Sequence, residues 1–273
     1  MKVLGIGESV IDNILNDASY TKHIGGPAPI ALMLLSRLGI DCTLLTTLGN
    51  DQNATIIQNA LTDEKVTVLA RREQHTKVNT YTINKETGAR KKIRGTTIHK
   101  HIEHLDQAFL QQFDIVIIDR HEKKAFDELK YKKAAHTKIL TDTSIEISPN
   151  TLDMIQYADY PIVPIEAVES IGVTQLLTIA KKPIIVTAGP IGSIIYDGGN
   201  RHLISAHKVV AIDVQGAGDI YRGAFAYGIL HNWNLTRCAE FANKVAALHC
   251  TRMGNAAAIP TKAELIHNGW MQL

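Results

Sequence analysis

Short apolar segments alternate along the chain with segments whose apolar residues recur at helical spacing. KVLGIG (residues 2–7) and CTLLTTLG (42–49) are typical of buried strands, whereas PIALMLLSRL (29–38) and ATIIQNALTDE (54–64) are typical of helices. Gly39 follows the first of these helices, and glycine is common at the place where a helix ends. The alternation predicts strands that are joined by crossover helices, as in an α/β fold.

Four further apolar runs extend the pattern into the second half of the chain. They are DIVIIDR (114–120), KILTDT (138–143), YPIVPI (160–165) and PIIVTAG (183–189). Runs of Val, Ile and Leu without polar alternation are typical of parallel strands that are buried on both faces. We therefore expect a doubly wound α/β fold, for which the length of the chain suffices.

The segment TKVNTYTINKETGARKKIRGTT (76–97) breaks this rhythm, because it is polar and alternates around Val78, Thr80 and Thr82. Such alternation predicts strands with one solvated face, and KETG at its centre predicts a hairpin turn. The segment is either a lid over an active site or a surface hairpin. Its basic run ARKKIR (89–94) is a solvated face, unless the lid brings it to an anionic substrate.

Composition and charge exclude several classes of function. The formal net charge is +2, with 45% hydrophobic and 21% charged residues, so neither nucleic acid nor an anionic membrane is an expected partner. No apolar run reaches the roughly 18 residues of a membrane span, and a signal peptide is not evident. Three scattered cysteines favour the cytoplasm over a disulfide framework. The cluster HKHIEH (99–104) lacks a ligand spacing and is interpreted as solvated histidines.

The segment DVQGAGDIYRGA (213–224) joins a turn of small residues to a carboxylate at the start of a helical pattern. Gly216, Ala217 and Gly218 allow a ligand to approach the backbone, and the N–H groups at a helix N-terminus attract anions. Asp219 follows them in the first turn. It either complements the helix dipole or acts as a general base beside the anion site, and the spacing alone leaves both roles open.

Several motifs, taken in their order along the chain, resemble those of the PfkB carbohydrate kinase family. Residues 213–224 are similar to its C-terminal signature, and GGPAPIALMLLSRLG (25–39) looks like its N-terminal signature. Three further segments occur in the order that the family requires: TLGND (47–51), TAGPIGSIIYDGG (187–199) and ALHCTRMGNAAAIPT (247–261). Agreement among ordered motifs is more specific than any one of them.

The resemblance implies a ribokinase-like fold, which is a three-layer α/β/α domain with a mostly parallel central sheet and a small β-sheet lid. The domain would span residues 1–273, with lid segments at about 12–25 and 76–97. It further implies ATP-dependent transfer of the γ-phosphoryl group to a hydroxyl of a sugar or sugar-like molecule. A nucleoside kinase and a non-catalytic binding relative are the alternatives. FDIVIIDRHE (113–122) resembles the ketohexokinase-like branch and favours a sugar. Unpaired strand edges in the lid could pair with those of a second subunit, so a homodimer through the lid is an open alternative.

The same resemblance implies roles for single residues. Asp219 would take the proton of the acceptor hydroxyl, and the backbone of residues 216–218 would stabilise the transferring phosphoryl group. Asp12 would bind acceptor hydroxyls, with a turn or cap as the alternative. Gly25 and Gly26 would let the acceptor approach the backbone, with an ordinary turn as the alternative.

Four residues are implied to form the nucleotide side. Thr187, Gly189 and Gly192 belong to a segment that lines the nucleotide site in the family. Small residues at the ends of strands leave room for a base or a ribose. Asn243, on a predicted helix, matches a position beside adenine, although an exposed helical Asn would look the same.

The chain departs from the family pattern at the acceptor and metal positions. Ile30 stands where the family often has an Asn that contacts the sugar. Many members of the family carry an N-x-x-E motif that organises Mg²⁺. Its Asn is absent here, and Glu166 at the Glu position is either a metal ligand or a helix-start Glu. Mg²⁺ is still expected, because transfer from ATP needs charge neutralisation. Val214 and Gln215 stand where hydroxyl residues are common in the family, and Asp213 belongs either to a monovalent-cation loop or to a simple turn. Asp142 is a strand-end carboxylate that is either part of the site or structural.

Overall fold

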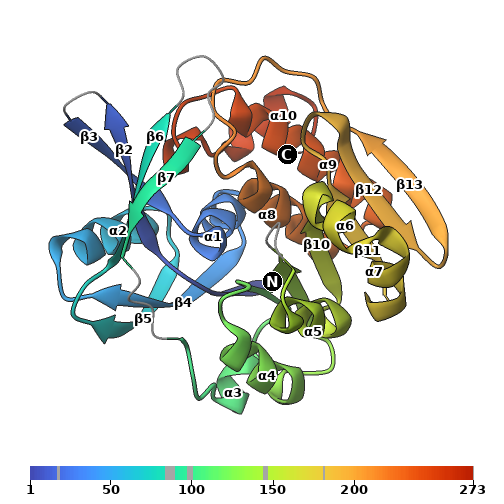
Figure 1. Ribbon diagram of the computed structural model, residues 1–273, viewed down its shortest axis with the longest axis horizontal. Coiled ribbons are helices and arrows are strands. Elements are labelled where there is room, and N and C mark those ends of the chain that lie inside the picture. The colour runs from blue at the N-terminus through green and yellow to red at the C-terminus, as the bar shows by residue number, and fades with distance from the viewer. Residues whose placement is uncertain (17–18, 84–89, 97–100, 144–146, 181, 273) are drawn as a thin grey trace.

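A computed structural model describes the chain except for residues 17–18, 84–89, 97–100, 144–146, 181 and 273 (Figure 1). Its larger sheet has the strand order β13-β12-β11-β10-β9-β8-β1-β4-β5. The strands are β1 (Lys2–Ile6), β4 (Asp41–Gly49), β5 (Thr67–Glu73), β8 (Ile115–Ile118), β9 (Lys138–Asp142), β10 (Tyr160–Pro164), β11 (Ile184–Thr187), β12 (Gly192–Asp197) and β13 (Asn200–Ser205). All pairs from β5 to β11 are parallel, whereas β12 and β13 are added antiparallel. The prediction of a mostly parallel sheet is confirmed.

Helices cover both faces of this sheet. They are α1 (Pro27–Arg37), α2 (Gln52–Asp63), α3 (Gln107–Leu110), α4 (Lys123–Lys132), α5 (Pro149–Tyr157), α6 (Ile165–Ile171), α7 (Val173–Ala180), α8 (Ala217–Leu230), α9 (Leu235–Cys250) and α10 (Lys262–His267). The central strand β8 shows how the layers are built. Ile115 and Ile117 pack on the side of α1, α8 and α9, while Val116 and Ile118 pack on the side of α4. Apolar residues on both faces therefore produce the three-layer α/β/α arrangement that was predicted.

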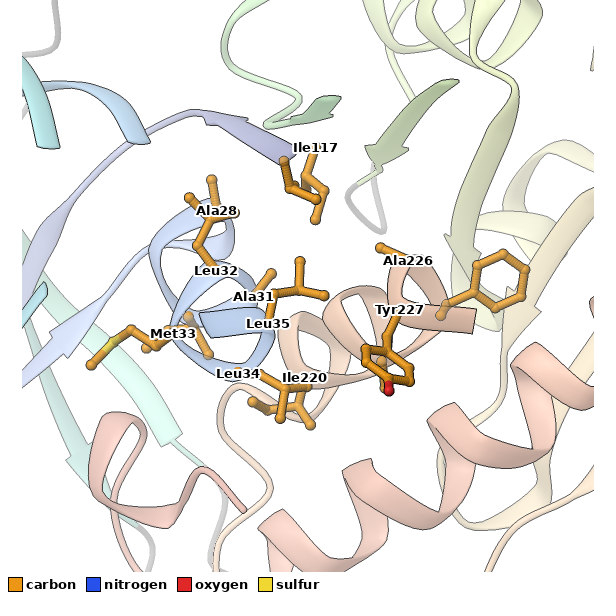
Figure 2. Close-up of a cluster of buried hydrophobic side chains, with 14 of the residues drawn as sticks. Ala28, Ala31, Leu32, Met33, Leu34, Leu35, Ile117, Ile220, Ala226 and Tyr227 are labelled. Atoms are coloured by element: carbon orange, nitrogen blue, oxygen red, sulfur yellow. The ribbon is translucent and has the colours of Figure 1, made fainter. Parts of the chain in front are cut away.

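Helix α1 lies at the centre of the larger core and is buried on all sides. Eight consecutive residues from Ala28 to Leu35 are buried, because the helix packs against the sheet and against α8 (Figure 2). Gly223 of α8 permits the close approach of the two helices, since a Cβ there would stand 2.8 Å from the carbonyl oxygen of Ala31. The packing fixes the N-terminus of α8 relative to the sheet.

A second sheet forms the lid and has the order β3-β2-β6-β7, with β2 (Val10–Asn16), β3 (Ser19–Gly25), β6 (Lys77–Ile83) and β7 (Arg90–Gly95). It stands to one side of the larger sheet in Figure 1. Both predicted lid segments contribute strands, while the KETG turn lies outside the described residues. Asp12 lies inside β2, so the alternative of a turn or cap Asp was wrong. Among the described residues, no helix has the length and apolarity that crossing a membrane requires.

Candidate active site

The predicted anion-binding residues 216–218 lie at the N-terminus of α8, and together with Gln215 they are called the anion loop. Gly216 is the N-cap residue with φ 78°, a left-handed conformation that favours glycine, and a Cβ there would collide with Oδ1 of Asn255. The N–H of Ala217 already donates to the carbonyl of Val214 at 3.3 Å. Gly218 is exposed, and no atom lies within 4 Å of the position of its missing Cβ. The backbone at Gly218 is therefore the most accessible part of this loop.

Asp213 and His249 hold the anion loop in place. The two carboxylate oxygens of Asp213 accept hydrogen bonds from the N–H groups of Gln215 at 3.1 Å and Gly254 at 3.0 Å. The buried ring of His249 places Nε2 at 2.7 Å from the carbonyl oxygen of Gln215. Asp213 thus performs the turn role that the sequence left as one of its alternatives.

The carboxylate of Asp219 lies in the first turn of α8, with its side chain 19% exposed. Burial, together with the negative charges of Asp119 and Asp12, raises the pKa of Asp219 to about 7, against the opposing effect of Arg120. A carboxyl group with such a pKa can accept a proton and release it again near neutral pH. The structure thus gives Asp219 the electrostatic surroundings that a general base needs.

An alternating row of charges continues from Asp219 into the sheet. Arg222 forms an ion pair with Asp219 and places Nη1 at 2.9 Å from Oδ2 of Asp142. The same Oδ2 lies 2.7 Å from Nη1 of Arg120, whose backbone N–H donates to Oδ1 at 3.1 Å. The side chains of Arg222 and Asp142 are only 8% and 5% exposed. Asp142 thus holds two arginines beside Asp219, and sequence reasoning missed Arg222 because Asp142, its partner on β9, is remote in the chain.

Asp12 reaches the anion loop from the lid. Its carboxylate accepts hydrogen bonds from Nδ2 of Asn79 at 3.1 Å and from Nε2 of Gln215 at 2.8 Å. Gly25 provides the space for this carboxylate, since a Cβ there would collide with Oδ2 of Asp12. Gly26 has φ 112° and caps α1, where a Cβ would collide with the carbonyl oxygen of Glu8. The two glycines therefore serve the packing of the lid against the sheet.

All four residues predicted for the nucleotide side line one cavity of about 680 Å³. They share it with two residues of the anion loop and with apolar side chains. The lining includes Thr187, Gly189, Gly192, Asn243, Ala217, Gly218, Val214, Ala246 and Ala247. Asn243 is only 7% exposed and donates to the carbonyl of Ile204 at 3.0 Å, so the alternative of an exposed helical Asn was wrong. A mostly apolar cavity that includes residues at a helix N-terminus suits a base joined to phosphates.

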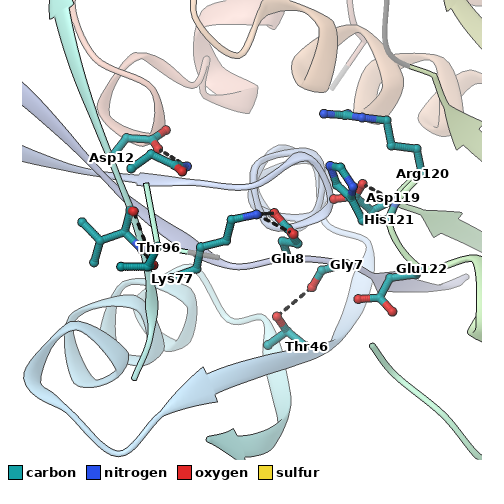
Figure 3. Close-up of polar contacts among 12 residues, drawn as sticks. Gly7, Glu8, Asp12, Thr46, Lys77, Thr96, Asp119, Arg120, His121 and Glu122 are labelled. Carbon is teal, nitrogen blue, oxygen red and sulfur yellow. Dashed lines mark hydrogen bonds and ion pairs between the residues drawn. The ribbon is translucent and has the colours of Figure 1, made fainter. Parts of the chain in front are cut away.

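A second cavity, of about 480 Å³, lies under the lid and was not predicted. Its lining residues are Glu8, Lys77, Lys92, Gly95, Thr96, His101 and His121. Lys77 places Nζ at 2.6 Å from Oε1 of Glu8, and Figure 3 shows this pair opposite His121 and Arg120. His101, from the predicted cluster of solvated histidines, is 43% exposed at its side chain, whereas His99 lies outside the described residues. The lid therefore covers a polar space beside Asp12.

The metal candidates are not brought together. Glu166 is exposed in the first turn of α6, and Asp213 binds backbone N–H groups of its own loop. Among the described residues, no three His, Cys, Asp or Glu side chains form a group that could hold a metal ion. Ile30 is fully buried in the core rather than at a ligand surface. The described part of the chain therefore offers no protein cage for Mg²⁺, a metal that commonly keeps waters and binds substrate phosphates.

Comparisons with known proteins agree with this geometry. Ribokinase from Schizosaccharomyces pombe is 34% identical over 113 residues, which cover 41% of this chain and 35% of that protein. The chain thus aligns with about a third of the length of that curated relative. The 5-dehydro-2-deoxygluconokinase from Clostridium tetani is 21% identical over 97% of this chain and 91% of its own length.

Solved structures show the same fold at low sequence identity. Ribokinase from Thermotoga maritima superposes with a TM-score of 0.85 at 20% identity, covering 97% of this chain and 98% of that one. Adenosine kinase from Sinorhizobium meliloti gives a TM-score of 0.85 at 16% identity, covering 98% and 99%. The fold is therefore ribokinase-like, as predicted. Residues 2–262 match the pfkB family carbohydrate kinase, and the chain belongs to that family.

Proposed function

We propose that this protein transfers the γ-phosphoryl group of ATP to a hydroxyl of a sugar or sugar-like small molecule. One observation carries the proposal. Gly218 lines the nucleotide-sized cavity, Asp219 follows it in the first turn of α8, and Gln215 of the same loop contacts Asp12 of the lid. A donor and an acceptor bound on these two sides would meet at the N-terminus of α8, where negative charge is stabilised.

In this mechanism Asp219 removes the proton of the acceptor hydroxyl as its oxygen attacks the γ-phosphorus of ATP. The bond from that phosphorus to the β,γ-bridging oxygen breaks, and ADP leaves with the negative charge. The backbone N–H groups at the start of α8 stabilise the equatorial oxygens during transfer. Asp12 orients the acceptor through its hydroxyl groups. Mg²⁺ bound to the phosphates of ATP would neutralise part of their charge, and among the described residues there is no group of three ligands that could hold it.

The nucleotide would occupy the cavity lined by Thr187, Gly189, Gly192 and Asn243. Its apolar wall suits the faces of a purine, while Gly192 has φ 115° and brings bare backbone to the cavity. The predicted assignments to Glu166 and to a monovalent ion at Asp213 remain predictions, since neither residue lies in an evident metal site.

A sugar is the favoured acceptor, because the curated relatives described above are named as a ribokinase and a 5-dehydro-2-deoxygluconokinase. A nucleoside is the second candidate, since the adenosine kinase from S. meliloti has the same fold. A coupled assay for ADP formation, run with pentoses, hexoses, sugar acids and nucleosides, separates these candidates. No ADP above the acceptor-free rate with any acceptor, combined with measurable ligand binding, would favour a non-catalytic relative instead.

A further inference from the structure

The cavity under the lid carries more positive than negative charge. Two lysines and two histidines line it with a single carboxylate, that of Glu8. Lys77 already neutralises this carboxylate, with Nζ at 2.6 Å and 2.5 Å from its two oxygens. The remaining cation, Lys92, forms no ion pair with any residue that the structure describes. A cavity with an uncompensated ammonium group attracts an anionic group of a ligand.

The sequence around Lys92 is adapted to place this ammonium group. A Cβ at Gly95 would stand 2.7 Å from Cε and 2.9 Å from Nζ of Lys92, so glycine lets the lysine fold across its own strand. The same Cβ position lies 3.0 Å from Oδ1 of Asn79, which is buried and has no hydrogen-bond partner among the described residues. Asn79 also donates to Asp12. An unpartnered acceptor and a free cation therefore lie next to the residue proposed to bind acceptor hydroxyls.

We infer that the acceptor is a sugar derivative with an acidic group, a carboxylate or a phosphate, which binds to Lys92 and His121 under the lid. This inference rests on the proposed function, because it names the acceptor of the same site. The hydroxyl groups of that acceptor face Asn79 and Asp12, and the reacting hydroxyl extends toward Asp219. His121 lies two residues after Asp119, whose charge acts on Asp219, so the cavity adjoins the phosphoryl-transfer centre.

The test compares matched acceptors: neutral sugars, the corresponding sugar acids and the corresponding sugar phosphates. The unmodified protein is expected to show a kcat/KM at least about 100-fold higher for one acidic acceptor than for its neutral counterpart. Lys92→Met is expected to lower that value about tenfold, equivalent to about 1.4 kcal/mol, mostly through KM. Lys91→Met is the matched control, because neighbouring side chains on a strand point to opposite faces.

The outcomes separate this inference from the proposed function. Equal kcat/KM for neutral and acidic acceptors, or equal losses in Lys92→Met and Lys91→Met, overturns the acidic acceptor and leaves the kinase intact. Calorimetry of the same acids and phosphates with the unmodified protein gives a readout that needs no turnover. If none of them binds in the presence of an ATP analogue, the inference fails even where a neutral sugar is phosphorylated.

Arg222 supports a second inference from a different observation. Its guanidinium is buried, and its two terminal nitrogens contact Asp219 on its own helix and Asp142 on β9. Arg120, which follows β8, contacts the same oxygen of Asp142 at 2.7 Å. Burial lowers the pKa of Arg222 to about 10, so it is still charged at neutral pH. Because Asp142 on β9 holds one nitrogen of Arg222, the position of the guanidinium is fixed by the sheet as well as by α8.

We propose that Arg222 is a positioning residue for the base. It holds Oδ1 of Asp219 and leaves Oδ2 for the acceptor hydroxyl, while Asp142 anchors the guanidinium. Asp119, which follows β8, and Asp12 of the lid raise the pKa of Asp219 and Arg120 lowers it, so the ion pair with Arg222 acts on a carboxylate that already has charged neighbours. The ion pair favours the ionised form of the Asp219 carboxylate and holds it in one orientation.

The test measures kcat against pH for Arg222→Met, Arg222→Lys and Asp142→Asn. Arg222→Met is expected to lower kcat at least about tenfold at pH 7 and to move the acidic limb of the profile to higher pH, with KM for ATP little changed. Arg222→Lys keeps a positive charge, so both the loss of kcat and the shift of the acidic limb should be smaller than in Arg222→Met. Asp142→Asn keeps Arg222 but weakens its anchor, so it should move the limb in the same direction even if Arg222→Met does not fold. An unchanged limb in folded Arg222→Met or in Asp142→Asn overturns the proposal.

Discussion

The side-chain amide of Gln215 donates a hydrogen bond of 2.8 Å to the carboxylate of Asp12, 203 residues earlier in the chain. Through this contact a strand of the lid meets the loop that precedes the N-terminus of α8. The backbone of the same residue is held by Asp213 and His249. The two sides proposed to bind acceptor and phosphate are therefore joined by one residue.

Replacing Gln215 by Leu should loosen this junction. The variant leaves one oxygen of the buried Asp12 without its amide donor, which costs about 1–3 kcal/mol of unfolding free energy. We expect KM for the acceptor to rise several-fold, because Asp12 is no longer oriented, while the affinity for ATP stays unchanged. Urea unfolding and steady-state kinetics measure both effects. A several-fold loss of ATP affinity with an unchanged acceptor KM would contradict the assignment of Asp12 to the acceptor.

Replacing Asp219 by Asn should remove the base and retain the fold. The substitution conserves size and takes away only the group that accepts the proton. We expect kcat to fall by about 10²–10⁴, with the dissociation constant of an ATP analogue within about threefold of that of the unmodified protein. Near-normal turnover in a folded Asp219→Asn protein would show that another group takes the proton.

The raised pKa of Asp219 predicts a definite pH dependence. Its pKa is about 7 in the folded protein, so kcat should decline as the pH falls through 7 and the base becomes protonated. Between the unfolded pKa, about 4, and 7, the folded state binds more protons, so this group's contribution to stability is lost as the pH rises.

Denaturant titrations at pH 5 and pH 8 test the sign of this linkage. Because Asn does not titrate, the stability of Asp219→Asn relative to the unmodified protein should be higher at pH 8 than at pH 5. The reverse order would mean that the ion pair with Arg222 outweighs burial and that the pKa of Asp219 lies below its unfolded value.

Two glycines of the anion loop should respond differently to alanine. Gly216→Ala forces a side chain into the left-handed region and against Asn255, which should cost about 1–3 kcal/mol of unfolding free energy. Gly218→Ala has open space and lies in a helix, so its stability should be equal or up to about 1 kcal/mol higher. Its methyl group borders the nucleotide cavity, however, and kcat/KM for ATP should fall. Equal unfolding midpoints for the two variants would contradict this account.

The elements that could be predicted from the sequence are those determined by residues that are neighbours in the chain. Continuous apolar runs identified β1, β4 and β8 to β11, and the small residues before Asp219 identified the start of α8. Strand β5, TVLARRE, was missed because it is polar and lies at the edge of the sheet. Strands β12 and β13 were missed because a hairpin with Gly198 and Gly199 interrupts a segment that had been assigned to ligand binding.

The candidate site could be predicted only as single residues. The resemblance to the family's motifs named Asp12, Asp219 and Asn243, but it could not show that Gln215 contacts Asp12 or that Arg222 contacts Asp142. Those contacts depend on how separate strands and helices are brought together, and no periodicity in the sequence encodes such a pairing. For the same reason the charged cavity under the lid became visible only in three dimensions.

Gly26 has a consequence for how the two ligands affect each other. It alone separates the last residue of β3 from the first residue of α1, and α1 packs on α8 through Gly223. If acceptor binding shifts the lid, the shift would therefore act through α1 on the helix that carries Asp219. Acceptor and nucleotide should bind with a coupling free energy, and each should change the affinity of the other by the same factor.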